Sequence, residues 1–214
     1  MRVLRAEGLG ARSRRGWLFR HVDLDVDRGS VLAVTGRPGS GRTSLLLALA
    51  GRFATSEGTV WRDGVAALGQ VPGVHEPEPA LTVAEHLEER LLLLGADRPA
   101  LSRLTPFTRR RERRDLRTRR VADALARYAD ELDPGLRGRD LTGYQRQLLG
   151  LALADLERPA LVLVDDVDTG LDAAERTRIW TALHDLAARG PAVIAAGRET
   201  DPTGRADAYE MGQS

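Results

Sequence analysis

The chain has 214 residues, of which 42% are hydrophobic, and its 32 basic and 31 acidic residues give a formal net charge of +1. This length fits one domain with a full core, and the near-neutral charge argues against bulk attraction to nucleic acid. No apolar run approaches the roughly 18 residues of a membrane span, the N-terminus lacks the apolar core of a signal peptide, and the absence of Cys excludes a disulfide framework. We therefore expect a cytoplasmic protein.

The first informative stretch is a strand, a glycine-rich loop and a helix in direct succession. Residues 31–35, VLAVT, form a short apolar run that predicts a buried strand. The loop GRPGSGRTS at 36–44 follows, and TSLLLALA at 43–50 predicts a buried helix that ends near Gly51. This succession is the context that a phosphate-binding loop requires.

The loop predicts a nucleotide site, because glycines allow backbone N–H groups to converge on phosphates at a helix N-terminus. Thr43 supplies a hydroxyl suited to Mg²⁺. Arg42 stands where the pattern has Lys, but all 32 basic residues of this chain are Arg, so the exchange says little about lost function. A glycine-rich turn without a ligand is the alternative. The expected nucleotide-binding residues are Gly36, Arg37, Pro38, Gly39, Ser40, Gly41, Arg42, Thr43 and Ser44.

The middle of the chain predicts helices. TVWR at 59–62 indicates a short strand, after which the pattern from Leu81 to about Leu132 is helical. We expect a helical subdomain at about 81–150, inserted into an α/β core. Within it, RRRERRDLRTRR at 109–120 contains eight Arg and is either an anion-binding patch or, as we favour, a solvated helix face.

The α/β pattern then returns. LVLVDD at 161–166 predicts a strand that ends in two carboxylates, and Asp172 is suited to cap the helix that follows. That helix ends at Gly190, and 192–197 predicts a further buried strand. Strands that alternate with helices predict an α/β fold with a mostly parallel, covered sheet.

The segment LTGYQRQLLGLALADLERPALVLVDDVDTGLD at 141–172 resembles the signature-to-aspartate-loop segment of ABC (ATP-binding cassette) ATPases. The phosphate loop, the strand and turn at 58–64 and LTV at 81–83 stand in the family's order, so the resemblance covers nearly the whole chain. It implies a P-loop NTPase core, with residues 1–214 forming a single ABC-type nucleotide-binding domain.

The resemblance also implies roles for individual residues. Asp165 would hold Mg²⁺ together with Thr43, Asp166 takes the place of the catalytic Glu, and Arg198 takes the place of the switch His. The signature reaches across a head-to-tail dimer to the ATP of the partner domain. It consists here of Leu141, Thr142, Gly143, Tyr144 and Gln145.

Several positions depart from the family's pattern. Tyr144 replaces a glycine and is expected to narrow the room beside the γ-phosphate. Counting back from Leu81, Gly73 occupies the place of the lever glutamine, and Gln70 lies three residues earlier. No aromatic residue for adenine stacking lies near Ser13, so Trp17 is a secondary candidate.

The resemblance therefore implies an ATP-binding subunit of an ABC transporter, with ATP and Mg²⁺ as ligands and low intrinsic ATPase activity. Its partners would be a second nucleotide-binding domain, identical or related, and a separately encoded transmembrane subunit that docks near residues 73–90. This places it at the inner face of the membrane, with no nucleic acid partner expected. The alternative is a regulatory module that hydrolyses ATP weakly or not at all, with a heterodimer in which this chain supplies the degenerate site as a variant.

Overall fold

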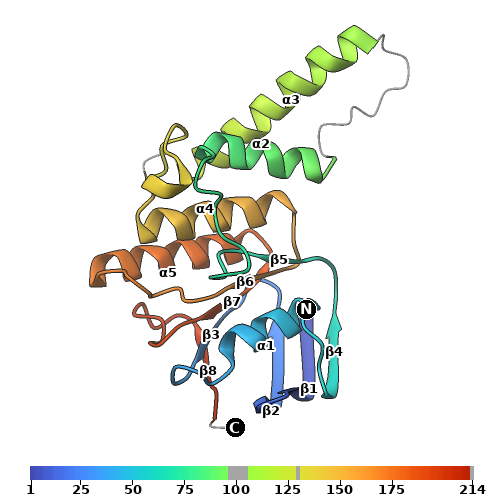
Figure 1. The fold of residues 1–214 in the computed structure, drawn as a ribbon, viewed down its shortest axis with the longest axis vertical. Coiled ribbons are helices and arrows are strands. Elements are labelled where there is room, and N and C mark those ends of the chain that lie inside the picture. The colour runs from blue at the N-terminus through green and yellow to red at the C-terminus, as the bar shows by residue number, and fades with distance from the viewer. Residues whose placement is uncertain (96–105, 129–130, 213–214) are drawn as a thin grey trace.

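The computed structural model describes residues 1–95, 106–128 and 131–212, with the backbone alone for 106–113. It consists of two sheets and a set of helices arranged in layers (Figure 1). The part of the helical prediction that covers 96–105 lies outside the described residues.

The central layer is a five-stranded sheet in which every neighbouring pair is parallel. The predicted α/β fold with a mostly parallel sheet is therefore confirmed. The strands in spatial order are β5 (Ala66–Leu68), β6 (Leu161–Val164), β7 (Ala192–Ala196), β3 (Val31–Thr35) and β8 (Asp207–Glu210).

Both faces of this sheet are covered, which explains why its strands are continuous apolar runs. In β6, Val162 and Val164 face the core on the side of the long helices, and Leu161 and Leu163 face the opposite core. This alternation follows from the two-residue period of a strand.

A second, antiparallel sheet forms the outer layer below the parallel one (Figure 1). Its residues and those of α1 (Arg42–Leu49) share the second core. Sequence patterns indicated only the last strand of this sheet. The strands in spatial order are β2 (Gly16–Asp27), β1 (Arg2–Ser13) and β4 (Glu57–Arg62).

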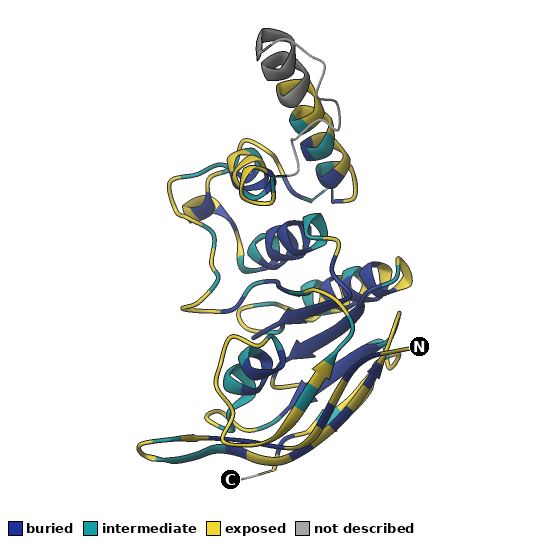
Figure 2. Ribbon diagram, turned by 90° about the vertical axis from the view of Figure 1, so that its right-hand side faces the viewer, coloured by how far each residue is buried: buried dark blue, intermediate teal, exposed yellow. Residues whose placement is uncertain are grey.

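The opposite face of the parallel sheet carries α4 (Gly143–Leu156) and α5 (Ala173–Ala188). Beyond them lie α2 (Val83–Leu93) and α3 (Pro106–Ala126). Of these two helices, α3 projects from the body of the molecule (Figures 1 and 2). A 3₁₀ turn at Gly138–Asp140 leads into α4.

Three helices begin with the same capping arrangement. α2, α4 and α5 start after Thr82, Thr142 and Asp172, and in each case the side chain three residues later bonds back to the cap backbone. These reciprocal bonds satisfy backbone N–H groups that a helix leaves without partners. The predicted cap at Asp172 is confirmed.

The predicted apolar stripe is buried along the inner side of α3 at Val121 and Ala124 and continues past the end of the helix at Tyr128. Of the arginine-rich segment, Arg114 and Arg119 are exposed. Among the described residues no helix is both long and apolar enough to cross a bilayer.

Candidate nucleotide-binding site

The loop between β3 and α1 holds its glycines in conformations that only glycine adopts without strain. Gly39 and Gly41 have φ angles of 82° and 86°. A Cβ on Gly41 would lie 2.2 Å from the carbonyl oxygen of Leu18, whereas one on Gly39 would meet no atom within 4 Å. Gly41 therefore allows the loop to contact the β1–β2 hairpin, and Gly39 leaves an open surface.

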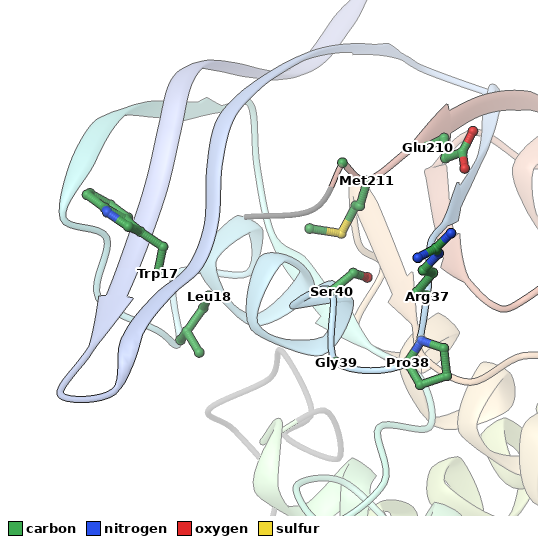
Figure 3. Close-up of a pocket in the computed structure, with 9 residues that line it drawn as sticks. Trp17, Leu18, Arg37, Pro38, Gly39, Ser40, Glu210 and Met211 are labelled. Carbon is green, nitrogen blue, oxygen red and sulfur yellow. The ribbon is translucent and has the colours of Figure 1, made fainter.

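A cavity of about 610 Å³ lies over this loop, between the tip of the β1–β2 hairpin and the segment after β8 (Figure 3). The loop lines one wall through Arg37 to Ser40, of which Arg37, Pro38 and Gly39 are exposed. The Ser40 Oγ is buried and has no hydrogen-bond partner. Because buried polar atoms are normally paired, this atom fits a site that takes a polar ligand. Ser44 is half-buried in the first turn of α1.

The indole of Trp17 does not face the phosphate loop. Figure 3 shows it directed away from Ser40 and Met211. The guanidinium carbon of Arg20 lies 4.2 Å from the ring centroid, and a Cβ on Gly10 would lie 3.3 Å from the ring. The indole therefore packs on the outer sheet while Trp17 also lines the hairpin side of the cavity, and its role in adenine stacking stays a prediction.

Thr43 and Asp165 meet although 122 positions separate them. The Thr43 Oγ1 donates a hydrogen bond of 2.5 Å to the Asp165 Oδ2, and Asp165 is only 1% exposed. Burial raises the pKa of Asp165, and the hydrogen bonds from Thr43 and from the Asp166 backbone oppose that shift. Two oxygen donors thus lie together at the C-terminal end of β6, a chemistry that suits Mg²⁺.

The next residue, Asp166, has a φ of 45°, a left-handed conformation that is uncommon outside glycine. The side-chain amide of Gln147 in α4 donates to the carbonyl oxygens of Asp165 and Asp166, at 3.4 Å and 3.2 Å. Gln147 is 4% exposed. Sequence reasoning missed this residue, because a Gln in the middle of a helix carries no motif of its own.

Arg42 lies within hydrogen-bonding or ion-pair distance of three separate segments. One guanidinium nitrogen, Nη1, donates to the Gly36 carbonyl oxygen and, at 2.7 Å, to the Gly197 carbonyl oxygen. The other terminal nitrogen, Nη2, lies 3.9 Å from the Asp166 Oδ1. The Arg42 side chain is 10% exposed, whereas the Asp166 side chain is 36% exposed.

The segment after β7 is held by a second carboxylate. The Asp168 Oδ2 accepts hydrogen bonds from the backbone N–H groups of Arg198, at 2.7 Å, and Glu199, at 3.0 Å. Arg198 itself is exposed. Its backbone is therefore fixed beside the site, while its side chain extends into solvent.

Gln70 contacts the segment that carries the two carboxylates, whereas Gly73 lies in a turn farther along the chain. The Asp165 N–H donates to the Gln70 carbonyl oxygen at 3.0 Å, and the Gln70 Oε1 is buried without a hydrogen-bond partner. Gly73 lies instead at an exposed turn closed by the pairing of Val71 with His75. The assignment of the lever position to Gly73 stays a prediction, and Gln70 is the residue whose backbone bonds to Asp165.

The signature residues form the start of α4. Thr142 and Gln145 cap each other, with N–H···O distances of 3.2 Å and 3.1 Å. Leu141 is buried, and a Cβ on Gly143 would lie 3.4 Å from the Leu171 side chain. The signature is thus a capped helix N-terminus.

The burial of Tyr144 argues against the expected narrowing of the room beside a phosphate, which stays a prediction. Its side chain is 6% exposed and turns inward between α4 and α5, where the Arg178 guanidinium lies 4.5 Å from the ring centroid. Burial raises the pKa of the Tyr144 hydroxyl. Whether a residue near the start of a helix faces a ligand or the core depends on how that helix packs. The signature motif alone does not contain this information.

Comparison with known proteins gives a consistent result. A family model described as "ABC transporter" matches residues 19–169. The chain is 33% identical over 207 residues to a putative ABC transporter ATP-binding protein of Streptomyces coelicolor, covering 90% of this chain and 33% of that protein. It is 30% identical to a hemin import ATP-binding protein of Gloeobacter violaceus, covering 90% of this chain and 71% of that protein. The chain spans about a third of the length of the first two curated relatives.

Solved structures share the fold. An ATP-binding cassette of an ABC transporter superposes with a TM-score of 0.76 at 20% identity, covering 99% of this chain and 88% of that one. The protein cbiO1 from Clostridium perfringens, part of the ABC transporter complex cbiONQ, gives a TM-score of 0.75 at 19% identity, covering 98% and 84%.

Proposed function

The chain belongs to the ABC transporter family of ATP-binding proteins, and on this basis we propose that it binds Mg-ATP over the phosphate loop and couples ATP binding and hydrolysis to a membrane partner. The observation that carries the proposal is the open glycine loop. It holds the unpartnered Ser40 Oγ, and it leads directly to Thr43, which is hydrogen-bonded to Asp165. We also propose that residues 1–214 form a single nucleotide-binding domain, with residues 81–150 as its helical subdomain.

The triphosphate would lie on the loop that Gly36 to Thr43 form. The first N–H groups of α1 have no carbonyl partners within the helix, and its dipole favours an anion at that end. Gly39 offers open space where a methyl group would stand in the way of a phosphate. Main-chain groups supply most of this binding, so it does not depend on a lysine.

The residues present fit Mg²⁺. The Thr43 hydroxyl and the Asp165 carboxylate supply hard oxygen ligands side by side, and few protein ligands are needed because Mg²⁺ keeps waters and phosphate oxygens. When bound, the ion would neutralise phosphate charge. A bound cation would oppose the burial that raises the pKa of Asp165, because it favours the ionised carboxylate.

We assign Asp166 the role of orienting and polarising the attacking water. Its carboxylate follows the strand that carries Asp165 and is 36% exposed, so a water molecule can reach it. Asp is one methylene shorter than Glu, about 1.5 Å by a C–C bond length, and such a displacement reduces a rate without abolishing it. We assign Arg198 to the γ-phosphate, which its guanidinium can contact by donation alone. Compared with a site that has Lys, Glu and His at positions 42, 166 and 198, we expect low intrinsic turnover from these substitutions together.

The partner that completes the site would be a second nucleotide-binding domain, identical or related. The capped N-terminus of α4, with Gly143 at its first turn, would face the triphosphate held by that partner. The burial of Tyr144 between α4 and α5 keeps its ring out of this contact. A transmembrane subunit would dock near residues 73–90 and hold the domain at the inner face of the membrane.

The proposal is tested by two measurements on the purified chain. ATP binding with Mg²⁺ is measured by isothermal titration, and steady-state phosphate release is compared for the wild type, Asp166→Asn and a control, Asp25→Asn, which alters an exposed carboxylate that pairs with Arg2 on the outer sheet. We expect saturable binding in all three and loss of phosphate release in Asp166→Asn alone. Absence of binding would refute the nucleotide site. Unchanged phosphate release in Asp166→Asn would exclude Asp166 as the catalytic carboxylate, and binding without phosphate release in the wild type would favour the regulatory module.

A further inference from the structure

The cation and the carboxylate that depart from the family's pattern face each other. Arg42 stands where the pattern has Lys, and Asp166 stands where it has Glu. The Arg42 Nη2 and the Asp166 Oδ1 lie 3.9 Å apart. The two substitutions therefore meet in space, although 124 positions separate them along the chain (166 − 42).

Their changes in length oppose each other. The terminal nitrogen of Arg lies one covalent bond farther from Cα than that of Lys, and the oxygens of Asp lie one bond closer to Cα than those of Glu. An Arg and Asp pair thus spans the same number of bonds between the two backbones as a Lys and Glu pair. The longer cation compensates for the shorter carboxylate.

The guanidinium also makes contacts that an ammonium group at one point cannot make together. While Nη2 faces Asp166, Nη1 donates to the carbonyl oxygens of Gly36 and Gly197. Guanidinium is a planar fork that donates in several directions at once, whereas Lys offers one nitrogen on a flexible chain. Arg42 is largely buried, with a 10% exposed side chain, so these contacts are shielded from solvent.

These contacts connect the phosphate loop with the two segments that flank it. Gly36 begins the loop, and Gly197 directly precedes Arg198, whose N–H group is bonded to Asp168. Asp166 has a left-handed φ of 45°, so its side-chain direction depends on an unusual backbone conformation that its surroundings must maintain. An opposite charge that faces this carboxylate favours one orientation of it.

We propose that Arg42 and Asp166 act as a matched pair, in which Arg42 positions the Asp166 carboxylate and the backbone at Gly197 relative to the phosphate loop. In this arrangement Arg42 is a positioning residue rather than a damaged lysine, and neither substitution is neutral without the other. The inference rests on the proposed ATP-binding function for its catalytic consequence, but the pairing itself exists without a nucleotide.

A double-variant cycle tests the pair. Arg42→Lys, Asp166→Glu and the double variant are compared with the wild type in kcat, KM for ATP and, without nucleotide, the midpoint of thermal unfolding. We expect each single variant to lower kcat on the order of 10-fold, since displacements near 1 Å have effects of this size or larger. The double variant should regain at least about 5-fold over the product of the single effects, within the coupling observed for contacting residues.

The split between kcat and KM separates positioning from general damage. Misplacement of Asp166 should lower kcat more than it raises KM, because the carboxylate acts on the attacking water and not on the bound phosphates. A control cycle pairs Arg42→Lys with Asp63→Glu, a carboxylate that contacts Arg28 instead, and should be additive. The unfolding midpoints should show the same non-additivity for Arg42 and Asp166 only.

Additive effects in both kcat and the unfolding midpoint would overturn the matched pair, and so would a higher kcat in Arg42→Lys alone. A wild type that does not bind ATP would refute the proposed function instead, while the cycle of unfolding midpoints would still decide whether the pair exists.

Discussion

Replacement of Gly39 by Ala is the sharpest single test of the phosphate loop, because Gly73 provides a matched control. Gly39 and Gly73 have φ angles of 82° and 71°, and a Cβ on either would meet no atom within 4 Å. Gly39 lines the cavity over the loop, whereas Gly73 lies in an exposed turn, where its N–H donates to the Glu76 Oε1 at 3.1 Å. Any difference between the two variants in ATP binding therefore comes from the cavity.

The stability cost should be similar in both variants. A non-glycine residue in the left-handed region costs about 1–2 kcal/mol, and in a chain of this size each kcal/mol lowers the thermal midpoint by about 2–4 °C. We expect Gly39→Ala and Gly73→Ala each to lower the midpoint by about 2–8 °C. Thermal unfolding without nucleotide measures this part.

The two variants should differ in their affinity for ATP. A methyl group on Gly39 would keep a phosphate from its backbone contacts, and a hydrogen bond to a charged group contributes about 1.5–3 kcal/mol. Loss of one such bond weakens binding by a factor of roughly 10 to 150 at about 1.4 kcal/mol per tenfold. Isothermal titration should show this loss in Gly39→Ala and wild-type affinity in Gly73→Ala. Equal affinities in both variants would refute the assignment of the loop as the phosphate site.

Three further outcomes follow from buried groups. His184 is among the groups that hold the pKa of Asp201 at about 2, against the desolvation that would raise it. Because the folded pKa lies below the unfolded value, the stabilisation is present above about pH 4 and is lost as the pH falls toward 2. Asp201→Asn should therefore lower the free energy of unfolding by about 2 kcal/mol at pH 7. Urea titrations should show that this loss of stability becomes smaller below pH 4. A loss that stays constant with pH would contradict the reasoning. Tyr144→Gly should destabilise the fold by about 3–5 kcal/mol, as for loss of a large core side chain, without raising ATPase activity; a gain in turnover would show that the ring obstructs the site. Thr43→Val should remove the hydrogen-bond partner of the buried Asp165 oxygen and lower the free energy of unfolding by about 1–3 kcal/mol. It should also abolish the Mg²⁺ dependence of ATP binding. If that dependence is retained, Thr43 is excluded as a Mg²⁺ ligand.

The parallel core could be predicted from sequence because its strands are short, continuous apolar runs that end at chemically distinctive residues. Residues 31–35 match β3 without error, and the predicted strands at 161–166 and 192–197 extend beyond β6 and β7 by only one or two residues. The paired hairpin strands β1 and β2 were missed. Their alternation of buried and exposed residues is interrupted by register shifts, so a period of two is not sustained along β1.

The candidate site, too, could be predicted from the sequence only in part. The resemblance to ABC ATPases assigned Thr43 and Asp165 to one Mg²⁺ site, and the two residues are hydrogen-bonded to each other in the structure, with Asp166 next in the chain. The contacts of Gln70 and Gln147 could not be predicted, since they depend on how β5 and α4 lie against β6. The inward turn of Tyr144 depends in the same way on the packing of α5, which a motif read along one chain segment does not contain.

The central claim is that this chain binds Mg-ATP at the phosphate loop, and isothermal titration of the wild-type protein with ATP in the presence of Mg²⁺ tests it most directly. The account predicts saturable binding to one site per chain, weakened when Mg²⁺ is removed by a chelator. No saturable heat up to millimolar ATP, with the protein shown to be folded by its thermal transition, would contradict it.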